Sequence, residues 1–444
     1  MLKPAAMASA LLSMTVLFAG CSSSQPESKP APSTGATAAG AAKEAPKVTE
    51  ISFVTHSNWE KPLTKVIAEF EKESPEIKVN VQYNPYAKLM ETNEIKLAAK
   101  SADLDVVTVD VPLNANYAVK GYLEPLDAYF KNDARKVWVD SALQAAEYRG
   151  QLMSVPMNSS GVVLFYNKDL LTKSNIPFPS ADVKDRLTWE QVLEMAKKLT
   201  HDNVYGFSVD QIGRAYQLLP LLQSKDASPL DETGLVSTGY TNSPASVKAL
   251  TFYYDLFNTS KVSPKIKREE SPDYFTSGKV ALFLSNTANL AKIQASGIPY
   301  GIAPHPYFEG GKIATPTGSL NLGISRFSTK KDAAAKFIQY VSSGKGAQIL
   351  FEESSQLPAL KSLLDQIDKD PKYNELPGSV LKLISAESRT TAAPRPLTPG
   401  YLEWENNFNK ALEDIKNGAD PKKTLDDTAG LIDTQLRKYG SAGK

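Results

Sequence analysis

Apolar and polar positions recur with two different periods in the early part of the chain. Residues 51–56 (ISFVTH) form a short apolar run typical of a strand, and apolar residues then follow the i, i+3, i+4, i+7 spacing of one helix face across residues 63–70. Residues 79–83 alternate as a second strand, residues 87–101 fit a helix, and residues 105–110 (DVVTVD) suit a buried parallel strand. Strands and helices in alternation predict an α/β fold.

A second region with the same alternation begins near Gly161. Two helix starts are marked in it: Thr188 and Gln191 have capping-box spacing, and Pro244 follows Ser243 as it would in a first helical turn. The strands predicted in this region cover residues 161–167, 204–210, 280–286, 300–306 and 319–325. The tail is predicted to be helical over residues 332–341, 400–418 and 422–436.

Length and charge narrow the class of protein. The chain has 444 residues, and the roughly 420 that follow residue 20 exceed what one hydrophobic core usually supports, so two lobes are expected. Hydrophobic residues make up 42% of the chain, which is typical of a globular protein. Lys and Arg number 50 against 49 Asp and Glu, a net charge of +1, without the basic excess of nucleic-acid binders. Nucleic acid is therefore not an expected partner.

The segment around Cys21, the only cysteine in the sequence, indicates how the protein is exported and anchored. Residues 1–20 contain one basic residue, Lys3, and an uncharged stretch too short to span a membrane, which predicts a secretion signal. Residues 21–47 are expected to be a flexible tether, because they contain almost nothing that could form a core. Signal, cysteine and tether in this order resemble a bacterial lipoprotein precursor that is cleaved before Cys21 and carries its lipid there. An ordinary signal peptide with an incidental cysteine is the alternative.

Motifs of known chemistry are missing from the sequence. It contains no G-x-G-x-x-G, no P-loop, no G-x-S-x-G and no H-E-x-x-H. His56, His201 and His305 lie far apart and lack a metal-ligand spacing, so they are expected at the surface or at strand ends and no metal site is predicted. A glycoside hydrolase needs only two carboxylates in a cleft, so the spacing of acidic residues leaves that enzyme class open.

Polar and aromatic residues stand where several predicted strands end. Residues 57–62 (SNWEKP) follow the first strand, Tyr83 and Tyr86 lie near the end of the second, and Asp110 ends the third. Ligands of open α/β sheets bind beyond the carboxyl ends of the strands. Aromatic faces pack on the C–H faces of sugar rings, while carboxylates, amides and guanidinium groups bond paired hydroxyls. Each residue could instead be an ordinary loop residue, but together they predict a polar, aromatic cleft.

Several segments taken in order resemble a known family, the extracellular carbohydrate-binding proteins of ABC importers, of the maltose-binding-protein type. The segments are VIAEFEKESPEIKVNVQY, LDVVTVD followed by GYLEPLD, VLFYNKDLLTKSNIP, LTWEQVLEMAKKLT, FTSGKVALFLS, YGIAPHP and APRPLTPGY. The resemblance runs from Glu50 to Tyr439. It implies a two-lobed, periplasmic-binding-protein-like (type II) α/β fold with the ligand cleft between the lobes. The chain would cross between lobes near Met157–Gly161, Asn286–Tyr300 and Ser325–Lys330.

The resemblance also implies lobes and site residues. One lobe would comprise residues 48–157 plus about 300–328, the other residues 158–299 plus about 329–444. Positions that match the family's ligand-binding segments, or stand at strand ends beside them, are Asn58, Trp59, Glu60, Tyr86, Asp110, Asn158, Arg214, Tyr216, Asn286, Thr287, Ser319, Arg395 and Tyr401. Trp59 is expected to stack on the ligand, with a core tryptophan folded under the loop as the alternative. Relatives often have Gly-x-Trp where this chain has SNTANL, so Asn286 and Thr287 could replace stacking with hydrogen bonds, and no relative's sugar specificity transfers.

We therefore interpret the sequence as the lipid-anchored substrate-binding component of an ABC importer, which captures a sugar or oligosaccharide by lobe closure. No catalytic residue, cofactor or metal is expected. The expected partners are a carbohydrate, the permease subunits and the membrane, reached through lipid on Cys21, and the protein is expected to be a monomer. It would lie on the extracellular face of the cell membrane, or on the periplasmic side if the source has an outer membrane. Alternatives are the same fold binding a polyamine, phosphate ester or metal complex, and a tethered glycoside hydrolase.

Overall fold

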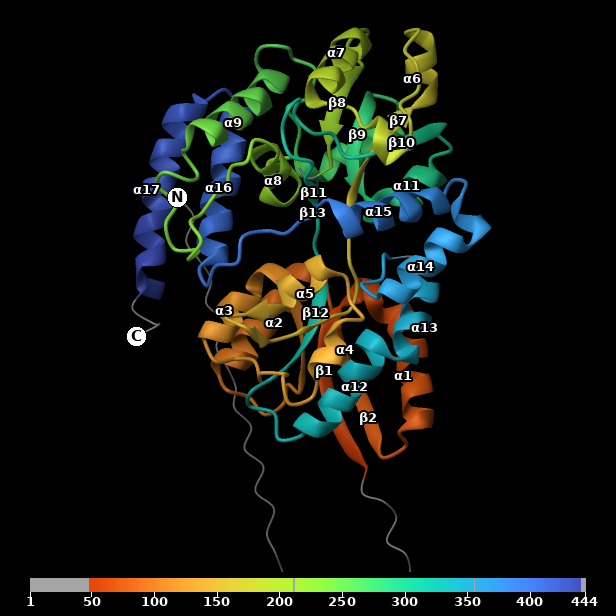
Figure 1. The fold of residues 1–444 in the computed structure, drawn as a ribbon, viewed down its shortest axis with the longest axis vertical. Helices are drawn as coiled ribbons and strands as arrows, with labels where there is room; N and C mark the ends of the chain where they lie inside the picture. The colour runs from red at the N-terminus through yellow and green to blue at the C-terminus, as the bar shows by residue number, and fades with distance from the viewer. Residues whose placement is uncertain (1–47, 211, 355, 441–444) are drawn as a thin grey trace, which may run out of the picture. The chain divides into compact units, whose positions relative to one another are not determined.

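Two main sheets organise the residues that the computed structural model describes, which are 48–210, 212–354 and 356–440. The five-stranded sheet has the order β2-β1-β3-β12-β6, and the four-stranded sheet has the order β10-β7-β9-β8. Figure 1 labels β1, β2 and β12 of the first and all the strands of the second. Their strands are β1 (Thr49–His56), β2 (Ile77–Asn84), β3 (Val106–Asp110), β6 (Val155–Pro156) and β12 (Leu320–Ile324), and β7 (Val162–Asn167), β8 (Tyr205–Val209), β9 (Val280–Asn286) and β10 (Tyr300–Ala303). Two small sheets pair β4 (Glu147–Tyr148) with β5 (Gln151–Leu152) and β11 (Thr315–Pro316) with β13 (Ala392–Ala393).

The first sheet has the predicted α/β pattern. β1 pairs in parallel with β2 along its whole length and with β3 over a shorter stretch, so the carboxyl ends of all three strands lie at one edge. β12 runs antiparallel to β3 and sets Leu320 opposite Asp110. This register brings the residue before β12, Ser319, to the same edge as the strand ends, and the prediction of an α/β fold is confirmed.

Helices fill the connections between the strands. In chain order they are α1 (Glu60–Glu73), α2 (Tyr86–Ala98), α3 (Asn114–Val119), α4 (Asn132–Arg135), α5 (Asp140–Ala146), α6 (Lys168–Lys173), α7 (Trp189–Leu199), α8 (Ala215–Ser224), α9 (Pro244–Phe257), α10 (Ser271–Thr276), α11 (Leu290–Ala295), α12 (Lys331–Ser343), α13 (Lys345–Ser354), α14 (Lys361–Lys369), α15 (Gly378–Thr390), α16 (Tyr401–Lys416) and α17 (Pro421–Gly440). Single 3₁₀ turns are η1 (Ser57–Trp59), η2 (Val111–Leu113), η3 (Val183–Asp185), η4 (Arg268–Glu270), η5 (Thr287–Asn289) and η6 (Pro371–Tyr373).

The predicted helix starts are confirmed by their caps. At α7 the Thr188 hydroxyl accepts from the Gln191 amide at 3.2 Å, and the Gln191 side chain accepts from the Thr188 amide at 2.9 Å, which completes a capping box. At α9 the Ser243 hydroxyl accepts from the Ser246 amide at 3.2 Å, with proline in the first turn. These caps satisfy amide groups that have no partner inside the helix.

Buried side chains of the central strands alternate between two apolar cores. Along β7, Val162 and Leu164 join one cluster of buried residues, whereas Val163 and Phe165 join the other. Successive side chains of a strand point to opposite faces of the sheet, so both faces of this sheet are covered. A strand buried on both faces has the continuous apolar sequence that predicted β7.

Two of the three predicted passages between lobes are wrong. The segment Met157–Gly161 does lead from β6 in the first sheet to β7 in the second. Asn286–Tyr300, however, joins β9 to β10 within the four-stranded sheet. Ser325–Lys330 joins β12 to α12, and α12 packs on β12 and α1. The passage from the second sheet back to the first is instead the segment between β10 and β12, which contains β11.

The predicted lobe boundaries change accordingly. β10 pairs with β7, so residues 300–303 belong with the second sheet, whereas residues 300–328 were assigned to the first lobe. α13 packs on α1, and α12 packs on β12, so these helices belong with the first sheet, not with the second lobe. An apolar run in a sequence predicts that a segment is buried, but it does not say which sheet buries it.

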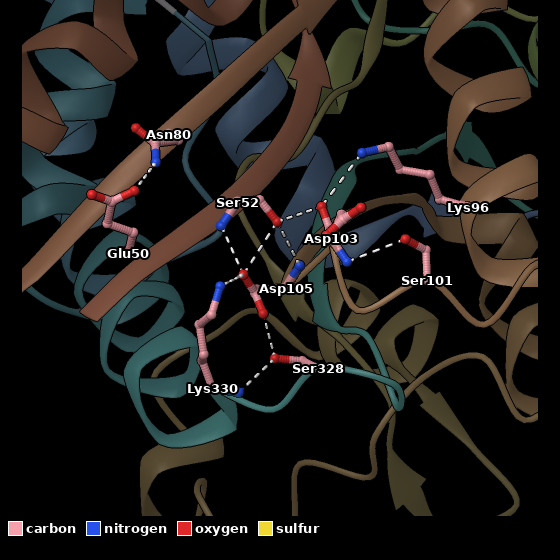
Figure 2. Close-up of polar contacts among 9 residues, drawn as sticks. All are labelled: Glu50, Ser52, Asn80, Lys96, Ser101, Asp103, Asp105, Ser328 and Lys330. Atoms are coloured by element: carbon pink, nitrogen blue, oxygen red, sulfur yellow. Dashed lines mark hydrogen bonds and ion pairs between the residues drawn. The ribbon is translucent and has the colours of Figure 1, made fainter. Parts of the chain in front are cut away.

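A buried carboxylate fastens the start of β3 to its neighbours (Figure 2). Asp105 is 0% exposed. Its oxygens accept from the Ser52 amide at 2.8 Å and from the Ser328 hydroxyl at 2.6 Å, and the Lys330 ammonium lies 3.3 Å away. The network ties β1, β3 and the β12–α12 connection together, at the end of β3 opposite to Asp110.

Cys21, with the predicted signal and tether, lies outside the described residues. In the described part of the chain, which begins at residue 48, no helix combines the length and apolarity needed to cross a membrane.

Candidate functional site

A cavity of about 610 Å³ opens at the carboxyl ends of β1, β2 and β3. Its volume lies within the range of about 300–1,000 Å³ common for small-molecule sites. Most of its lining is polar or aromatic: His56, Asn58, Trp59, Tyr86, Asp110, Asn158, Ser160, Arg214, Tyr216, Arg268, Asn286, Ala288, Gly318, Ser319, Leu320, Ser354, Gln356, Arg395 and Glu405. These residues come from strands of both main sheets, from the segments around them, and from the end of α13 and α16.

The structure brings most of the predicted site residues to this cavity. Those that line it are Asn58, Trp59, Tyr86, Asp110, Asn158, Arg214, Tyr216, Asn286, Ser319 and Arg395. Glu60, Thr287 and Tyr401 are not among the lining residues. Glu60 is exposed at the start of α1, Thr287 is buried in η5, and Tyr401 is buried behind Arg395, where its ring faces the guanidinium.

Asp110 and Arg395 form an ion pair in the wall of the cavity. Asp110 ends β3, and Arg395 lies in the connection between β13 and α16. The Arg395 Nη2 donates to Asp110 Oδ1 at 2.9 Å, and the Tyr86 hydroxyl donates to Asp110 Oδ2 at 2.5 Å. Burial alone would lower the pKa of the Arg395 guanidinium, but Asp110 raises that pKa well above its usual value. Arg395 therefore remains a cation at every physiological pH.

Two aromatic rings hold the Arg395 guanidinium in place. Its central carbon lies 5.2 Å from the ring centre of Tyr216 and 5.7 Å from that of Tyr401, within the range of cation–π attraction. The Tyr216 hydroxyl is 2.8 Å from the Ser160 hydroxyl, and the Tyr401 hydroxyl donates to Glu405 at 3.0 Å. Burial raises the pKa of both tyrosines, so both remain neutral hydrogen-bonding groups.

The exposed aromatic ring in the cavity is that of Tyr86, not that of Trp59. Trp59 is only 6% exposed and packs within an apolar core cluster, although it is among the residues that line the cavity. Tyr86 is 44% exposed, although its hydroxyl is enclosed against Asp110. Burial, followed by the nearby Asp110 charge, raises the pKa of that hydroxyl well above its usual value. Tyr86 therefore offers an accessible ring face next to a charged hydrogen-bonding pair.

Amide and imidazole groups complete the polar wall. The Asn158 carbonyl oxygen accepts from the Leu320 amide at 3.0 Å, which fixes this side chain against β12. Asn286 caps η5 by accepting from the Ala288 amide at 2.9 Å. His56 Nδ1 accepts from the Asn58 amide at 3.0 Å, and burial lowers the pKa of its imidazole. His56 is thus neutral in the cavity at neutral pH.

Several lining residues were not predicted. His56 is the last residue of β1, so the strand-end argument that selected Asp110 also applies to it. Glu405 stands one helical turn after Tyr401 on α16, a spacing that places the two on one helix face. Ser354, by contrast, ends α13 and Gln356 follows it, and both reach the cavity through the packing of α13 on α1. No local sequence signal marks them.

The described residues offer no ready set of metal ligands. Among them, no group of three His, Cys, Asp or Glu side chains is arranged to hold an ion. Asp110 and Glu405 both line the cavity, but the first is engaged by Arg395 and Tyr86 and the second by Tyr401. The arrangement can bind paired hydroxyl groups through charged hydrogen bonds and a sugar face through Tyr86.

Comparison with known proteins agrees with this geometry. Residues 56–348, more than half of the chain, match the profile of the bacterial extracellular solute-binding proteins. The chain belongs to this family. It is 28% identical over 410 residues to the galactooligosaccharide-binding protein of Bacillus subtilis (strain 168), covering 89% of this chain and 91% of that protein.

Solved structures of related proteins share the fold. The ABC substrate-binding protein Lmo0181 from Listeria monocytogenes, solved with cycloalternan, is 26% identical with a TM-score of 0.76, covering 88% of this chain and 99% of that one. The GacH receptor of Streptomyces glaucescens GLA.O is 22% identical with a TM-score of 0.73, covering 88% and 99%. The predicted family resemblance and the predicted two-lobed type II fold are confirmed.

Proposed function

We propose that this protein is the substrate-binding component of an ABC importer that captures an oligosaccharide in the 610 Å³ cavity and delivers it to a membrane permease. One observation carries the proposal: the exposed ring of Tyr86 adjoins the Asp110–Arg395 pair, so a stacking surface and charged hydrogen-bonding groups face the same space. Sugars present both an apolar C–H face and paired hydroxyls, and such a site matches both.

Capture works through a shift between open and closed states. Asp110 belongs to the first sheet, while Tyr216 lies in the first turn of α8, outside that sheet, so a ligand between them touches both lobes only when these approach. Because the ligand bonds to both lobes only in the closed state, it binds that state more tightly, and this differential affinity favours closure. Nothing in this cycle requires a bond to form or break, and we propose that the protein performs no catalysis.

The proposed ligand is a short neutral oligosaccharide. The lining has nine side chains with an amide or hydroxyl group and five charged ones, and its two carboxylates are already engaged by Arg395, Tyr86 and Tyr401. The related proteins named for galactooligosaccharides and solved with cycloalternan support this class. A polyamine would require free carboxylates, and a glycoside hydrolase would require a carboxylic acid free to protonate the glycosidic oxygen.

The proposal includes attachment to the membrane through lipid on Cys21. The support is the order of signal, cysteine and tether in residues 1–47. Cys21→Ser should give a protein that is released from the cell surface and binds its saccharide with unchanged affinity. Fractionation of cells that express the variant tests this, and a variant that stays with the membrane would contradict the anchor.

A thermal-shift screen tests ligand capture. The panel contains β-1,4-galactotetraose, maltotetraose and cycloalternan, with spermidine and sn-glycerol 3-phosphate as controls for the other ligand classes. A saccharide at 100 times its Kd should stabilise the folded protein by about 2.7 kcal/mol, which a melting curve resolves. Stabilisation by spermidine or the phosphate ester alone would overturn the sugar assignment. Chromatography of the incubated saccharide should recover it intact, and shortened products would reveal a hydrolase.

A further inference from the structure

A buried carboxylate that is not among the residues lining the cavity bonds to two segments that carry some of them. Glu387 on α15 is 1% exposed. Its Oε1 lies 2.8 Å from Nη1 of Arg186, a side chain that is also almost fully buried. Its Oε2 accepts from the Thr315 hydroxyl at 2.7 Å and also from the Thr391 hydroxyl. The charge of Glu387 is thus compensated by one cation and two hydroxyl donors.

The two threonines belong to the two segments that carry cavity residues. Thr315 begins β11, and Thr391 immediately precedes β13, whose parallel pairing sets Thr315 opposite Ala392. The Thr315 amide also donates to the Thr391 carbonyl at 2.9 Å. Beyond β11 the chain reaches Gly318 and Ser319, and beyond β13 it reaches Arg395, all of which line the cavity. Glu387 therefore holds together the segments that begin at Thr315 and Thr391, before each reaches the cavity.

Arg186 links the Glu387 carboxylate to the segment after β10, in the second sheet. Its Nη1 donates to the His305 carbonyl at 2.6 Å, just after β10. Next to it, the Trp189 amide donates to the Tyr307 carbonyl at 2.7 Å, which holds the start of α7 on the same segment. The network thus runs from α7 and the end of β10, through Arg186 and Glu387, to β11 and β13.

We propose that Glu387 and Arg186 are positioning residues for saccharide binding, holding Arg395 and Ser319 at the spacing that the ligand requires. The inference rests on the proposed function, because it assigns a role in the same site. A buried ion pair is a weak source of net stability compared with apolar packing, but loss of one partner leaves a charge without compensation. With Glu387 neutralised, β11 and β13 lose a shared acceptor, and the Arg395 segment gains freedom that ligand binding must remove.

The test compares Glu387→Gln and Thr391→Val with the matched control Asp105→Asn. Asp105 is an equally buried carboxylate that also accepts from a hydroxyl (Figure 2). It precedes β3, whereas Asp110, which lines the cavity, ends this strand. Thr391→Val leaves the Arg186–Glu387 pair intact and removes one donor, so it reports on positioning even if Glu387→Gln folds poorly. Calorimetry with β-1,4-galactotetraose, at a temperature well below each melting transition, should give about tenfold weaker binding for Glu387→Gln, threefold for Thr391→Val and no change for Asp105→Asn.

Amide hydrogen exchange of the ligand-free proteins supplies a reading that does not depend on the saccharide. In Glu387→Gln, residues 315–319 and 391–399 should exchange about tenfold faster, whereas the segments around residue 105 keep their wild-type rates. Unchanged exchange in both segments, or wild-type affinity in both Glu387→Gln and Thr391→Val, overturns the positioning role. If the wild type binds no saccharide, the proposed function fails, and the exchange rates still decide whether Glu387 holds these segments.

Discussion

Strand β3 has a carboxylate at each end, and the two have opposite surroundings. Asp105, just before the strand, is enclosed by Ser52, Ser328 and Lys330, all from the first sheet and its connections (Figure 2). Asp110, at the other end, lines the cavity and pairs with Arg395, which arrives from the connection before α16. The same residue type at the two ends of one strand thus makes contacts within the first lobe in one case, and in the other a contact in the cavity wall with the segment between β13 and α16.

The comparison distinguishes a carboxylate that stabilises the first lobe, Asp105, from one that is placed to bind a ligand, Asp110. A carboxylate such as Asp105, whose partners come from β1 and the β12–α12 connection, holds segments of the first lobe together, and a ligand cannot reach it. A carboxylate at a cavity wall whose partner lies on another segment keeps acceptor sites that a hydroxyl can approach. Burial alone therefore does not distinguish structural from functional acids here, since both are mostly enclosed.

The largest effect is expected for Asp105→Ala, on stability. The variant leaves the Ser52 amide and the Ser328 hydroxyl without their buried acceptor, and Lys330 without its counter-ion, so the free energy of unfolding should fall by about 3–5 kcal/mol. Urea unfolding measures this. Affinity for β-1,4-galactotetraose should stay within twofold of the wild type, and a tenfold loss would show that Asp105 acts on the cavity after all.

Arg395→Lys should weaken binding by about tenfold to a hundredfold with little change in stability. Lysine keeps the positive charge but loses the planar fork that bonds Asp110 while lying against the rings of Tyr216 and Tyr401. A lost charged hydrogen bond costs about 1.5–3 kcal/mol, which gives this range. Calorimetry at constant ionic strength measures the affinity. Unchanged binding would mean that charge alone, without geometry, serves the ligand.

A smaller effect separates Tyr86 from Trp59. Tyr86→Leu removes the exposed ring and should weaken saccharide binding by about 0.5–1.5 kcal/mol, whereas Tyr86→Phe keeps the ring and tests the hydroxyl alone. Trp59→Phe should mainly lower the melting temperature, because Trp59 packs in the core. Calorimetry measures the saccharide affinity of the three variants, and melting curves followed by tryptophan fluorescence measure their stability. A larger loss of affinity in Trp59→Phe than in Tyr86→Leu would show that Trp59 is the stacking residue.

The smallest effect concerns His56, beside the same strand ends. Its pKa is lowered by burial, so the unfolded chain takes up a proton at a higher pH than the folded protein does. Stability should therefore fall as the pH drops below about 6.5, towards the lowered pKa of the folded state, with a slope below about 1.4 kcal/mol per pH unit. Urea unfolding at pH 7.5, 6.5 and 5.5 measures the slope, and His56→Gln should reduce it. An identical slope in the variant would assign it to other groups.

The residues at the strand ends could be predicted from the sequence, whereas contacts between segments distant in the chain could not. Asp110, Tyr86 and Asn58 were predicted because parallel strands bring their carboxyl ends to one edge, a consequence of sheet geometry alone. Trp59 was expected to stack because it follows a strand in a polar segment, but the sequence does not say which way a ring turns, and here it turns into the core.

The features that could not be predicted from the sequence depend on long-range packing. Which sheet receives β10, and whether α12 and α13 cover the first or the second, depends on packing between segments that are distant in the chain. The Arg186–Glu387 pair is of the same kind, since neither residue has a local signal that names the other. By contrast, the caps at Thr188 and Ser243 depend on neighbours within three residues and were predicted correctly.

The most direct measurement is a calorimetric titration of the wild type, Asp105→Asn and Asp110→Asn with the saccharide that most stabilises the wild type in the thermal-shift screen. We predict equal Kd values for the wild type and Asp105→Asn, and a Kd raised about tenfold to a hundredfold for Asp110→Asn. Equal affinities in all three proteins, or a loss in Asp105→Asn as large as that in Asp110→Asn, would contradict the assignment of the two ends of β3 to stability and to binding.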